Sequence, residues 1–179
     1  RSIQKPYLLG HEEEYDKDYD DRIKRGELFN SDSIKFNEKL KYRTTGGRVV
    51  YGGGGITPVI IVPLAASLQD TLFMELYLSN TLTNFVYELY KNNRNYFNSF
   101  KTPADLDKGF TPSAPEWNAF LAAAAKDDIV ANKVSASGKA YLLQTIKVLM
   151  ARQMFRTEGY YQILNITDST VAKALQQLK

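Results

Sequence analysis

The chain has 179 residues, of which 44% are hydrophobic, so it is long enough for one domain or for a domain with part of another. Its 23 lysines and arginines are interspersed with 20 aspartates and glutamates, and the net charge of +3 predicts no nucleic-acid partner. Cysteine is absent, which excludes disulfides, thiolate nucleophiles and cysteine-based zinc sites.

The segment from Gly10 to Arg43 is polar, carries charges of both signs and has few periodic apolar positions. This pattern predicts a surface connection with one or two short helices, at about 15–24 and 33–40.

Acidic residues in this segment have the spacing of a calcium-binding loop. Asp16, Asp18 and Asp20 alternate along the chain, as the oxygen ligands of a hard cation do. Glu27 follows at the position of the last ligand of an EF-hand loop. Asp21 stands where that loop needs glycine for its sharp turn, so a solvated acidic segment is favoured and a calcium site is the alternative. No cofactor is predicted.

Two short β-type runs, at 48–51 and 59–62, flank four consecutive glycines, which are Gly52, Gly53, Gly54 and Gly55. Since glycine reaches positive φ without a Cβ clash, the predicted structure is a pair of strands joined or bent at a glycine-rich turn. A phosphate-binding loop is not favoured, because Thr57 and Pro58 follow where a Lys-Ser or Lys-Thr pair would open a helix.

After Pro63 the pattern becomes helical. A capping-box sequence at 67–70 predicts the start of one long helix that continues to about Lys91. The apolar residues of this helix lie on nearly all of its sides, so Leu82 and Phe85 are expected to be buried at the centre of a helical bundle. Polar residues interrupt every window of 18 residues, so no membrane span is predicted.

The next stretch, 92–115, is punctuated by proline and glycine and predicts a loop-rich connection. A second capping box, Ser113 with Glu116, predicts the start of a helix that continues to about Lys126. Trp117 in this helix is expected to be a core anchor.

A further helix is predicted from Ser135 or Ser137 to about Arg156, followed by a turn at 157–161 that includes two tyrosines. The chain then closes with a short helix at about 168–178. The predicted inner face of this last helix consists of Val171, Ala174, Leu175 and Leu178.

Two stretches carry a resemblance to a known family. The sequence GGRVVYGGGGITP at 46–58, with the apolar run that ends at Pro63, resembles the end of the peptidase domain in C-terminal processing (tail-specific) serine peptidases. RSIQKPY at 1–7 is similar to the end of a strand-and-turn segment of the same family. The family commonly has Asp after the proline of the first motif, and here Val59 follows, so no role of that carboxylate is carried over. The matching residues that we treat as a structural motif are Arg48, Tyr51, Gly52, Gly53, Gly54, Gly55 and Pro58.

The resemblance implies that the chain is the C-terminal portion of an envelope or periplasmic endopeptidase that cuts protein tails. In that family a Ser nucleophile and its Lys base precede the glycine motif, so they would lie upstream of Arg1. Ser135 and Ser137 with Lys139 imitate such a pair but follow the motif, and they are expected to cap a helix. The isolated chain is therefore predicted to be inactive.

The predicted fold is mainly α, with 1–64 as the end of the peptidase domain and 65–179 as a helical C-terminal domain. The expected partners are the rest of the parent peptidase, its peptide substrates, and a second copy through exposed strands. The alternative is a non-enzymatic helical protein-interaction module.

Overall fold

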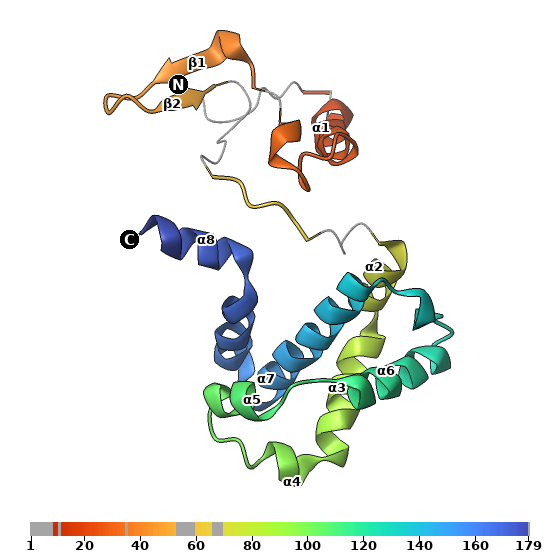
Figure 1. The fold of residues 1–179 in the computed structure, drawn as a ribbon. Helices are drawn as coiled ribbons and strands as arrows, with labels where there is room; N and C mark the ends of the chain where they lie inside the picture. The colour runs from red at the N-terminus through yellow and green to blue at the C-terminus, as the bar shows by residue number, and fades with distance from the viewer. Residues whose placement is uncertain (1–8, 11, 35, 53–59, 66–69, 179) are drawn as a thin grey trace. The chain divides into compact units, whose positions relative to one another are not determined.

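The computed structural model describes residues 9–10, 12–34, 36–52, 60–65 and 70–178 (Figure 1). The chain divides into two compact units, Arg1–Ala65 and Ala66–Lys179, which we call the N-terminal unit and the C-terminal unit. The division falls one residue from the boundary predicted at 64. The predicted fold class is confirmed, because the described chain is mainly helical with one small antiparallel sheet.

The N-terminal unit contains short elements only. The helix predicted at 15–24 is present and begins three residues earlier. The prediction of a helix at 33–40 is wrong, because the chain forms only single 3-10 turns near the two ends of this range. The elements of this unit are α1 (Glu12–Lys24), η1 (Ser31–Ser33), η2 (Glu38–Leu40), β1 (Lys41–Arg43) and β2 (Val49–Tyr51).

The two strands form an antiparallel hairpin in which Tyr42 faces Val50. Its turn is closed by two hydrogen bonds: the Thr44 N–H donates to the Arg48 carbonyl at 2.9 Å, and the Arg48 N–H donates to the Thr44 hydroxyl at 3.1 Å. Gly47 has φ +78°, a conformation that glycine adopts without a Cβ clash. The turn therefore uses the Gly46-Gly47 pair.

The strand pairing predicted from the sequence is wrong. The run at 48–51 was expected to pair with 59–62, but its partner is β1. Residues 60–62 form no strand, and residues 53–59 lie outside the described part of the chain. The physical reason is proximity: the five residues between β1 and β2 bring these strands together at a smaller cost in loop entropy than a longer connection would.

The N-terminal unit has no buried apolar residue among those whose side chains the structure describes, which leave out several positions of α1. Its one buried described side chain is the carboxylate of Glu27, at 8% exposure. The described apolar side chains that stay substantially exposed are Leu9, Ile23, Phe36, Tyr42, Ile60 and Leu64.

The C-terminal unit is a bundle of helices around one apolar core. Its elements are α2 (Thr71–Leu78), α3 (Asn80–Asn92), α4 (Arg94–Phe97), α5 (Pro103–Gly109), α6 (Ala114–Lys126), η4 (Ala131–Lys133), α7 (Ala136–Thr167) and α8 (Ser169–Gln177).

The single long helix predicted before Lys91 is instead two helices, because the chain breaks at Ser79. This residue has an extended backbone (φ −72°, ψ 153°), and its hydroxyl donates to the Leu76 carbonyl at 2.9 Å. Ser67 lies outside the described residues. Asp70 is the cap of α2, because its carboxylate accepts two backbone N–H groups of the first turn.

The loop-rich connection predicted at 92–115 contains two short helices that the sequence analysis missed. In α5 the Thr102 hydroxyl accepts from the Asp105 N–H at 3.1 Å, while the Asp105 carboxylate accepts from the Thr102 N–H at 2.9 Å. Pro103 occupies the first helical position, where its missing N–H costs nothing. The predicted start of α6 is confirmed, with the Ser113 N–H donating to Glu116 at 2.8 Å.

The core forms where α7 packs against α3 and α5, and where α3 also packs against α6. The predicted burial of Leu82 and Phe85 is confirmed, at 2% and 8% exposure, and Trp117 is buried as expected. Phe85 meets Phe120 edge to face, with 5.5 Å between ring centroids. The largest completely buried side chains are Phe73, Phe97, Phe120, Leu76, Leu82, Leu106, Leu142, Ile146, Met150 and Ile163.

A buried ion pair joins α7 to α5. The Lys147 ammonium lies 2.6 Å from Asp107 Oδ1 and donates to the Asp107 backbone carbonyl, also at 2.6 Å. Lys147 is only 7% exposed, so these contacts replace the water that its charge loses on burial.

The helix that the sequence predicts to end near Arg156 continues beyond it in the structure, and α7 has a kink at this residue. Arg156 has φ 58° and ψ −149°, and helical structure resumes after it. The turn predicted at 157–161 is therefore wrong, because these residues belong to the second half of α7. Gly159 packs tightly there: a Cβ at this position would lie 2.4 Å from Phe155 Cβ.

The last helix, α8, is present as predicted, with Asp168 as its cap. Its predicted inner face is wrong, because this face is not covered: Leu175 is 57% exposed and Leu178 is 83% exposed. None of the helices in the described part of the chain has the length and apolar character that a membrane crossing requires.

The kink supports a stability prediction. Only glycine adopts the backbone conformation of Arg156 without strain of about 1–3 kcal/mol, so Arg156→Gly should stabilise the C-terminal unit. Because glycine also loses more entropy on folding, we expect a net gain of about 1 kcal/mol, or a Tm about 4 °C higher. Thermal unfolding followed by the fluorescence of Trp117 measures this change.

The matched control is Arg152→Gly, one turn earlier in the regular part of α7. Glycine inside a helix costs about 1 kcal/mol, so this variant should have a lower Tm. Equal losses in the two variants would contradict the strain at Arg156.

Candidate functional site

The described part of the glycine motif ends in an exposed cluster around Tyr51. The Tyr51 ring stacks on Phe36 with 4.5 Å between centroids, and its hydroxyl donates to Glu38 at 2.9 Å. Lys41 lies 2.9 Å from the other oxygen of Glu38. Hydrogen bonds from Lys41 and then Tyr51 hold the pKa of the Glu38 carboxyl below its ordinary value. Every group here has a partner, so the cluster fixes the hairpin against η2.

Of the four glycines of the motif, Gly52 is the one that the structure describes. Gly52 donates its N–H to the Leu40 carbonyl at 2.8 Å and continues the hairpin by one residue. The other four motif residues, Gly53, Gly54, Gly55 and Pro58, lie outside the described residues. Arg48 is at the hairpin turn, as described above. Because four of the motif residues lie outside the described part of the chain, the predicted structural role of the motif stays a prediction.

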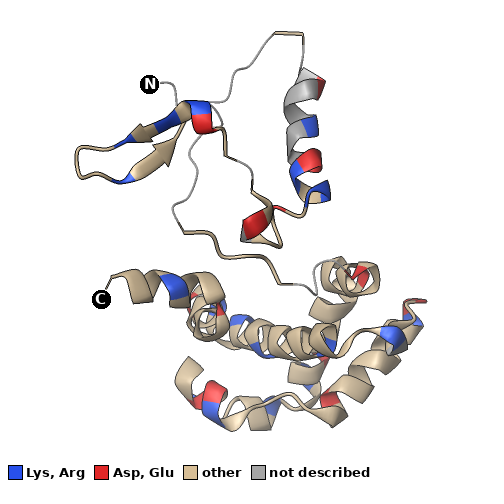
Figure 2. Cartoon of the chain, turned by 45° about the horizontal axis from the view of Figure 1, so that its top comes forward, with Lys and Arg blue, Asp and Glu red and all other residues tan. Residues whose placement is uncertain are grey.

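The acidic residues of the calcium alternative do not form a loop. Asp16, Asp18 and Asp20 belong to α1, where positions two residues apart lie about 200° apart around the axis. Glu27 instead forms ion pairs with two arginines: its carboxylate lies 3.0 Å from Arg22 Nε and 2.8 Å from Arg25 Nε. The described residues hold no cluster of three or more acidic or histidine side chains that suits a metal ion. Figure 2 shows the charges of both signs along α1.

The Glu27 cluster supports a pH prediction. Burial raises the pKa of this carboxyl, but hydrogen bonds from Arg25 and Arg22 and their charges outweigh it and leave the pKa below 4.5. Because the folded-state pKa is lowered, the ionised carboxylate stabilises the N-terminal unit above about pH 4.5. This contribution is lost as the pH falls through the lowered pKa. NMR titration of the Glu27 carboxyl carbon measures the value.

Replacing both Arg22 and Arg25 by Gln should raise the pKa of Glu27 above 4.5, because burial then acts without the two charges. Arg43→Gln, on the hairpin, is the control and should leave this titration unchanged. An unchanged pKa of Glu27 in the double variant would contradict the cluster.

The serine and lysine residues that imitate a catalytic pair belong to the start of α7. The Ser135 hydroxyl accepts from the Gly138 N–H at 3.1 Å, which confirms the predicted capping role, and Ser137 lies 3.2 Å from it. The Lys139 ammonium lies over the Trp117 ring, 5.2 Å from its centroid. Among the described residues no hydrogen bond joins the ammonium of Lys139 to the hydroxyl of either serine, so the geometry of a nucleophile and its base is not present.

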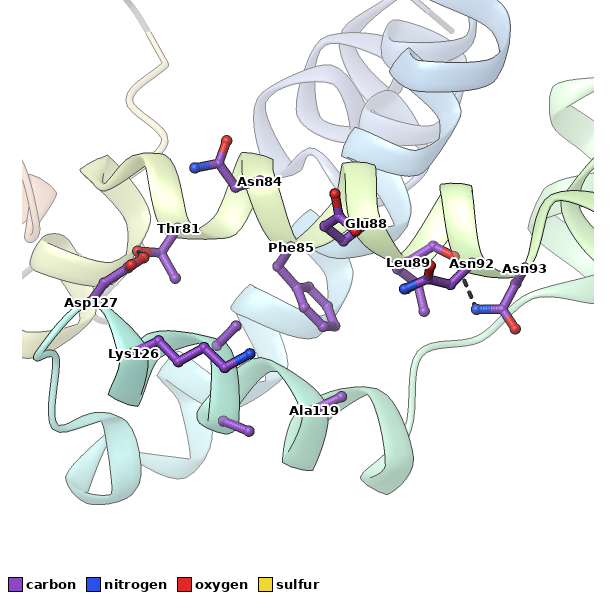
Figure 3. A pocket seen from close by; sticks show the side chains of 12 residues that line it. Thr81, Asn84, Phe85, Glu88, Leu89, Asn92, Asn93, Ala119, Lys126 and Asp127 are labelled. Atoms are coloured by element: carbon purple, nitrogen blue, oxygen red, sulfur yellow. Dashed lines mark hydrogen bonds between the residues drawn. The ribbon is translucent and has the colours of Figure 1, made fainter.

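The C-terminal unit has a groove between α3 and α6 (Figure 3). Its volume is about 450 Å³. Figure 3 shows Phe85 directed from α3 toward α6, with Thr81 and Asp127 meeting at one end, where the Thr81 hydroxyl donates to the Asp127 carboxylate. The apolar residues of the groove are Phe85, Leu89, Ala119, Ala122 and Ala123. The polar residues around them are Thr81, Asn84, Glu88, Asn92, Asn93, Lys126 and Asp127.

The alanine run of α6 produces this groove. Ala124 is completely buried against the core, whereas Ala119 and Ala122 on the neighbouring faces are exposed. A methyl side chain is too short to fill the space toward α3, so the helices leave an open channel with an apolar floor. This alanine run is visible in the sequence, but only the position of α3 identifies it as a groove wall.

The chemistry of the groove is that of binding. Its carboxylates already have partners: Asp127 accepts from Thr81, and Glu88 lies 2.8 Å from the Lys91 ammonium. An apolar floor with a polar border is typical of a site that receives a helix or a peptide side chain.

Comparison with known proteins gives one match. The model of a family of unknown function, DUF8443, matches residues 72–156, just under half of the chain. This segment runs from the start of α2 to the kink in α7 and includes both walls of the groove. No curated protein and no solved structure matches the chain.

Proposed function

We propose that this chain is the C-terminal part of a C-terminal processing serine peptidase of the cell envelope, and that it contributes no catalytic group. The observation that carries the proposal is the N-terminal unit, which bears the peptidase-like motif and has no apolar core among its described residues.

A unit of this kind needs another surface to fold against. Its sheet has two strands of three residues each, and an isolated hairpin is at best marginally stable in water. Phe36 and Tyr42 remain 42% and 51% exposed. A peptidase domain that continued the sheet beyond β1 or β2 would cover these side chains. The motif and the missing core therefore support the same proposal.

The test is to express the protein with the coding sequence upstream of Arg1 and to measure cleavage of a peptide with a free C-terminal tail. We expect hydrolysis that is lost when the upstream Ser nucleophile is replaced by Ala. The 179-residue chain alone should not hydrolyse the peptide, because its serines and Lys139 lack the required geometry.

Two results would overturn this proposal. One is an upstream sequence without a Ser and Lys in family context. The other is labelling of Ser135 or Ser137 in the isolated chain by a serine-directed probe, with the labelling abolished in Lys139→Ala.

A second candidate function, association of two copies through the C-terminal unit, is favoured by the exposed face of α8. Its apolar residues have the i, i+3, i+4, i+7 spacing of a helix that docks into a groove, and they are Val171, Ala174, Leu175 and Leu178. The groove between α3 and α6 offers the complementary apolar floor. One nine-residue helix covers less than the roughly 800 Å² per partner of a stable interface, so both copies would exchange α8 reciprocally.

Sedimentation at increasing protein concentration tests this association. We expect dimers that both Leu175→Asp and Ala122→Arg prevent, because each variant places a charge in one of the two apolar surfaces. Ala125→Arg, on an exposed face of α6 outside the groove, is the matched control and should still dimerise.

Mixing the two defective variants gives a sharper readout. Leu175→Asp keeps an intact groove and Ala122→Arg keeps an intact α8, so the mixture should recover one of the two contacts and form a weak heterodimer. A wild-type chain that stays monomeric at high concentration, or a Leu175→Asp or Ala122→Arg variant that dimerises as the wild type does, would contradict the exchange.

A further inference from the structure

A second hollow of the C-terminal unit lies between α3 and the part of α7 that ends at the kink. Its volume is about 580 Å³. The residues that line it are Thr83, Val86, Leu149, Arg152, Gln153, Met154 and Arg156.

The hollow holds Arg152 and Arg156, two of the three cations of α7 that have no acidic partner among the described residues. Of the basic side chains of α7, Lys139 lies over Trp117 and Lys147 is paired with a carboxylate. Arg152 stacks over the Tyr160 ring at 5.6 Å, a contact that orients its guanidinium and leaves the N–H groups at its edge available. For Arg156 no ion pair or ring contact is present within the described part of the chain. Figure 2 shows the basic positions along α7.

The backbone at Arg156 is the second observation. Its φ of 58° and ψ of −149° lie in a region that is open to glycine and strained for any other residue. Strain of this kind is concentrated at binding and catalytic sites. Here the strained residue is the one that carries a guanidinium into the border of the hollow.

We propose that this hollow binds a phosphate group. Two guanidinium groups provide forked N–H donors and two positive charges, which match the several oxygens and the double charge of phosphate. The Thr83 hydroxyl and the Gln153 amide supply neutral donors, and neither makes a hydrogen bond elsewhere in the described chain. Val86, Leu149 and Met154 form the apolar wall.

The volume indicates which phosphate compounds fit. A single inorganic phosphate leaves most of about 580 Å³ unfilled. A phosphate monoester with a small apolar group would place its phosphate at the arginines and its organic part against Leu149 and Met154. Inorganic phosphate and phenyl phosphate therefore serve as the two probes.

Isothermal titration of the full chain with each probe, at constant ionic strength, tests the proposal. We expect saturable 1:1 binding, with phenyl phosphate at least threefold tighter than inorganic phosphate. Arg152→Gln and Arg156→Gln should each weaken binding at least tenfold. Arg94→Gln, an exposed arginine on α4 outside the hollow, is the matched control and should bind as the wild-type chain does.

Arg156→Gly separates binding from folding. This variant should lose phosphate binding at least tenfold while its Tm without ligand rises, so the loss cannot come from unfolding. Tighter binding of inorganic phosphate than of phenyl phosphate would support the arginine site, but it would show that Leu149 and Met154 do not bind the organic group. Equal binding by the wild-type chain and by both arginine variants, or retained binding in Arg156→Gly, would overturn the proposal.

Discussion

The C-terminal unit depends on burying one face of the first half of α7. Leu142, Ile146 and Met150 follow one another at spacings of four and are completely buried against α3 and α5. Burying each such side chain contributes about 1.5–3 kcal/mol, so this stripe is a substantial source of stability. The Lys147 ammonium adds specificity, because its two contacts with Asp107 fix α5 in one register on α7. The groove and the hollow are both side effects of this packing, since α7 determines where α3 lies.

The sequence was sufficient for elements whose signals are local. Periodicity and capping residues located α6, α8 and the first half of α7, and the burial of Leu82 and Phe85 followed from an apolar helix in a bundle. The break at Ser79 had a local signal, because serine is a preferred N-cap residue and the following Asn80 and Thr81 are weak helix formers, but the apolar residues on both sides of it outweighed that signal. The helix α5 had a local signal, Thr102 with Pro103 and Asp105, which the prolines and glycine nearby outweighed. The hairpin was misplaced because the run of four glycines is a stronger turn signal than the Gly46-Gly47 pair that the turn uses.

The candidate sites were beyond sequence reasoning for a different reason. The groove requires α3 and α6 to lie side by side, and the hollow requires α3 beside α7, so neither follows from any one segment. The positive φ of Arg156 had no signal at all, because arginine is an ordinary helix residue. Conversely, the most conspicuous sequence pattern, the serines before Lys139, proved to be a helix cap with a lysine over Trp117. Residue type at a given spacing identifies chemistry only when the backbone brings the groups together.

The two units differ in what holds them together, and this difference bears on function. The C-terminal unit has its own core, so it can tolerate strain of about 1–3 kcal/mol at Arg156 and an uncovered face on α8. The described N-terminal unit has no such reserve: an ion cluster at Glu27 and an exposed aromatic pair stabilise short elements that a larger sheet would support better. A strained residue and an exposed apolar face persist only where a core compensates for their cost to stability. The two units therefore differ in the reserve of stability that each can set against exposed or strained features.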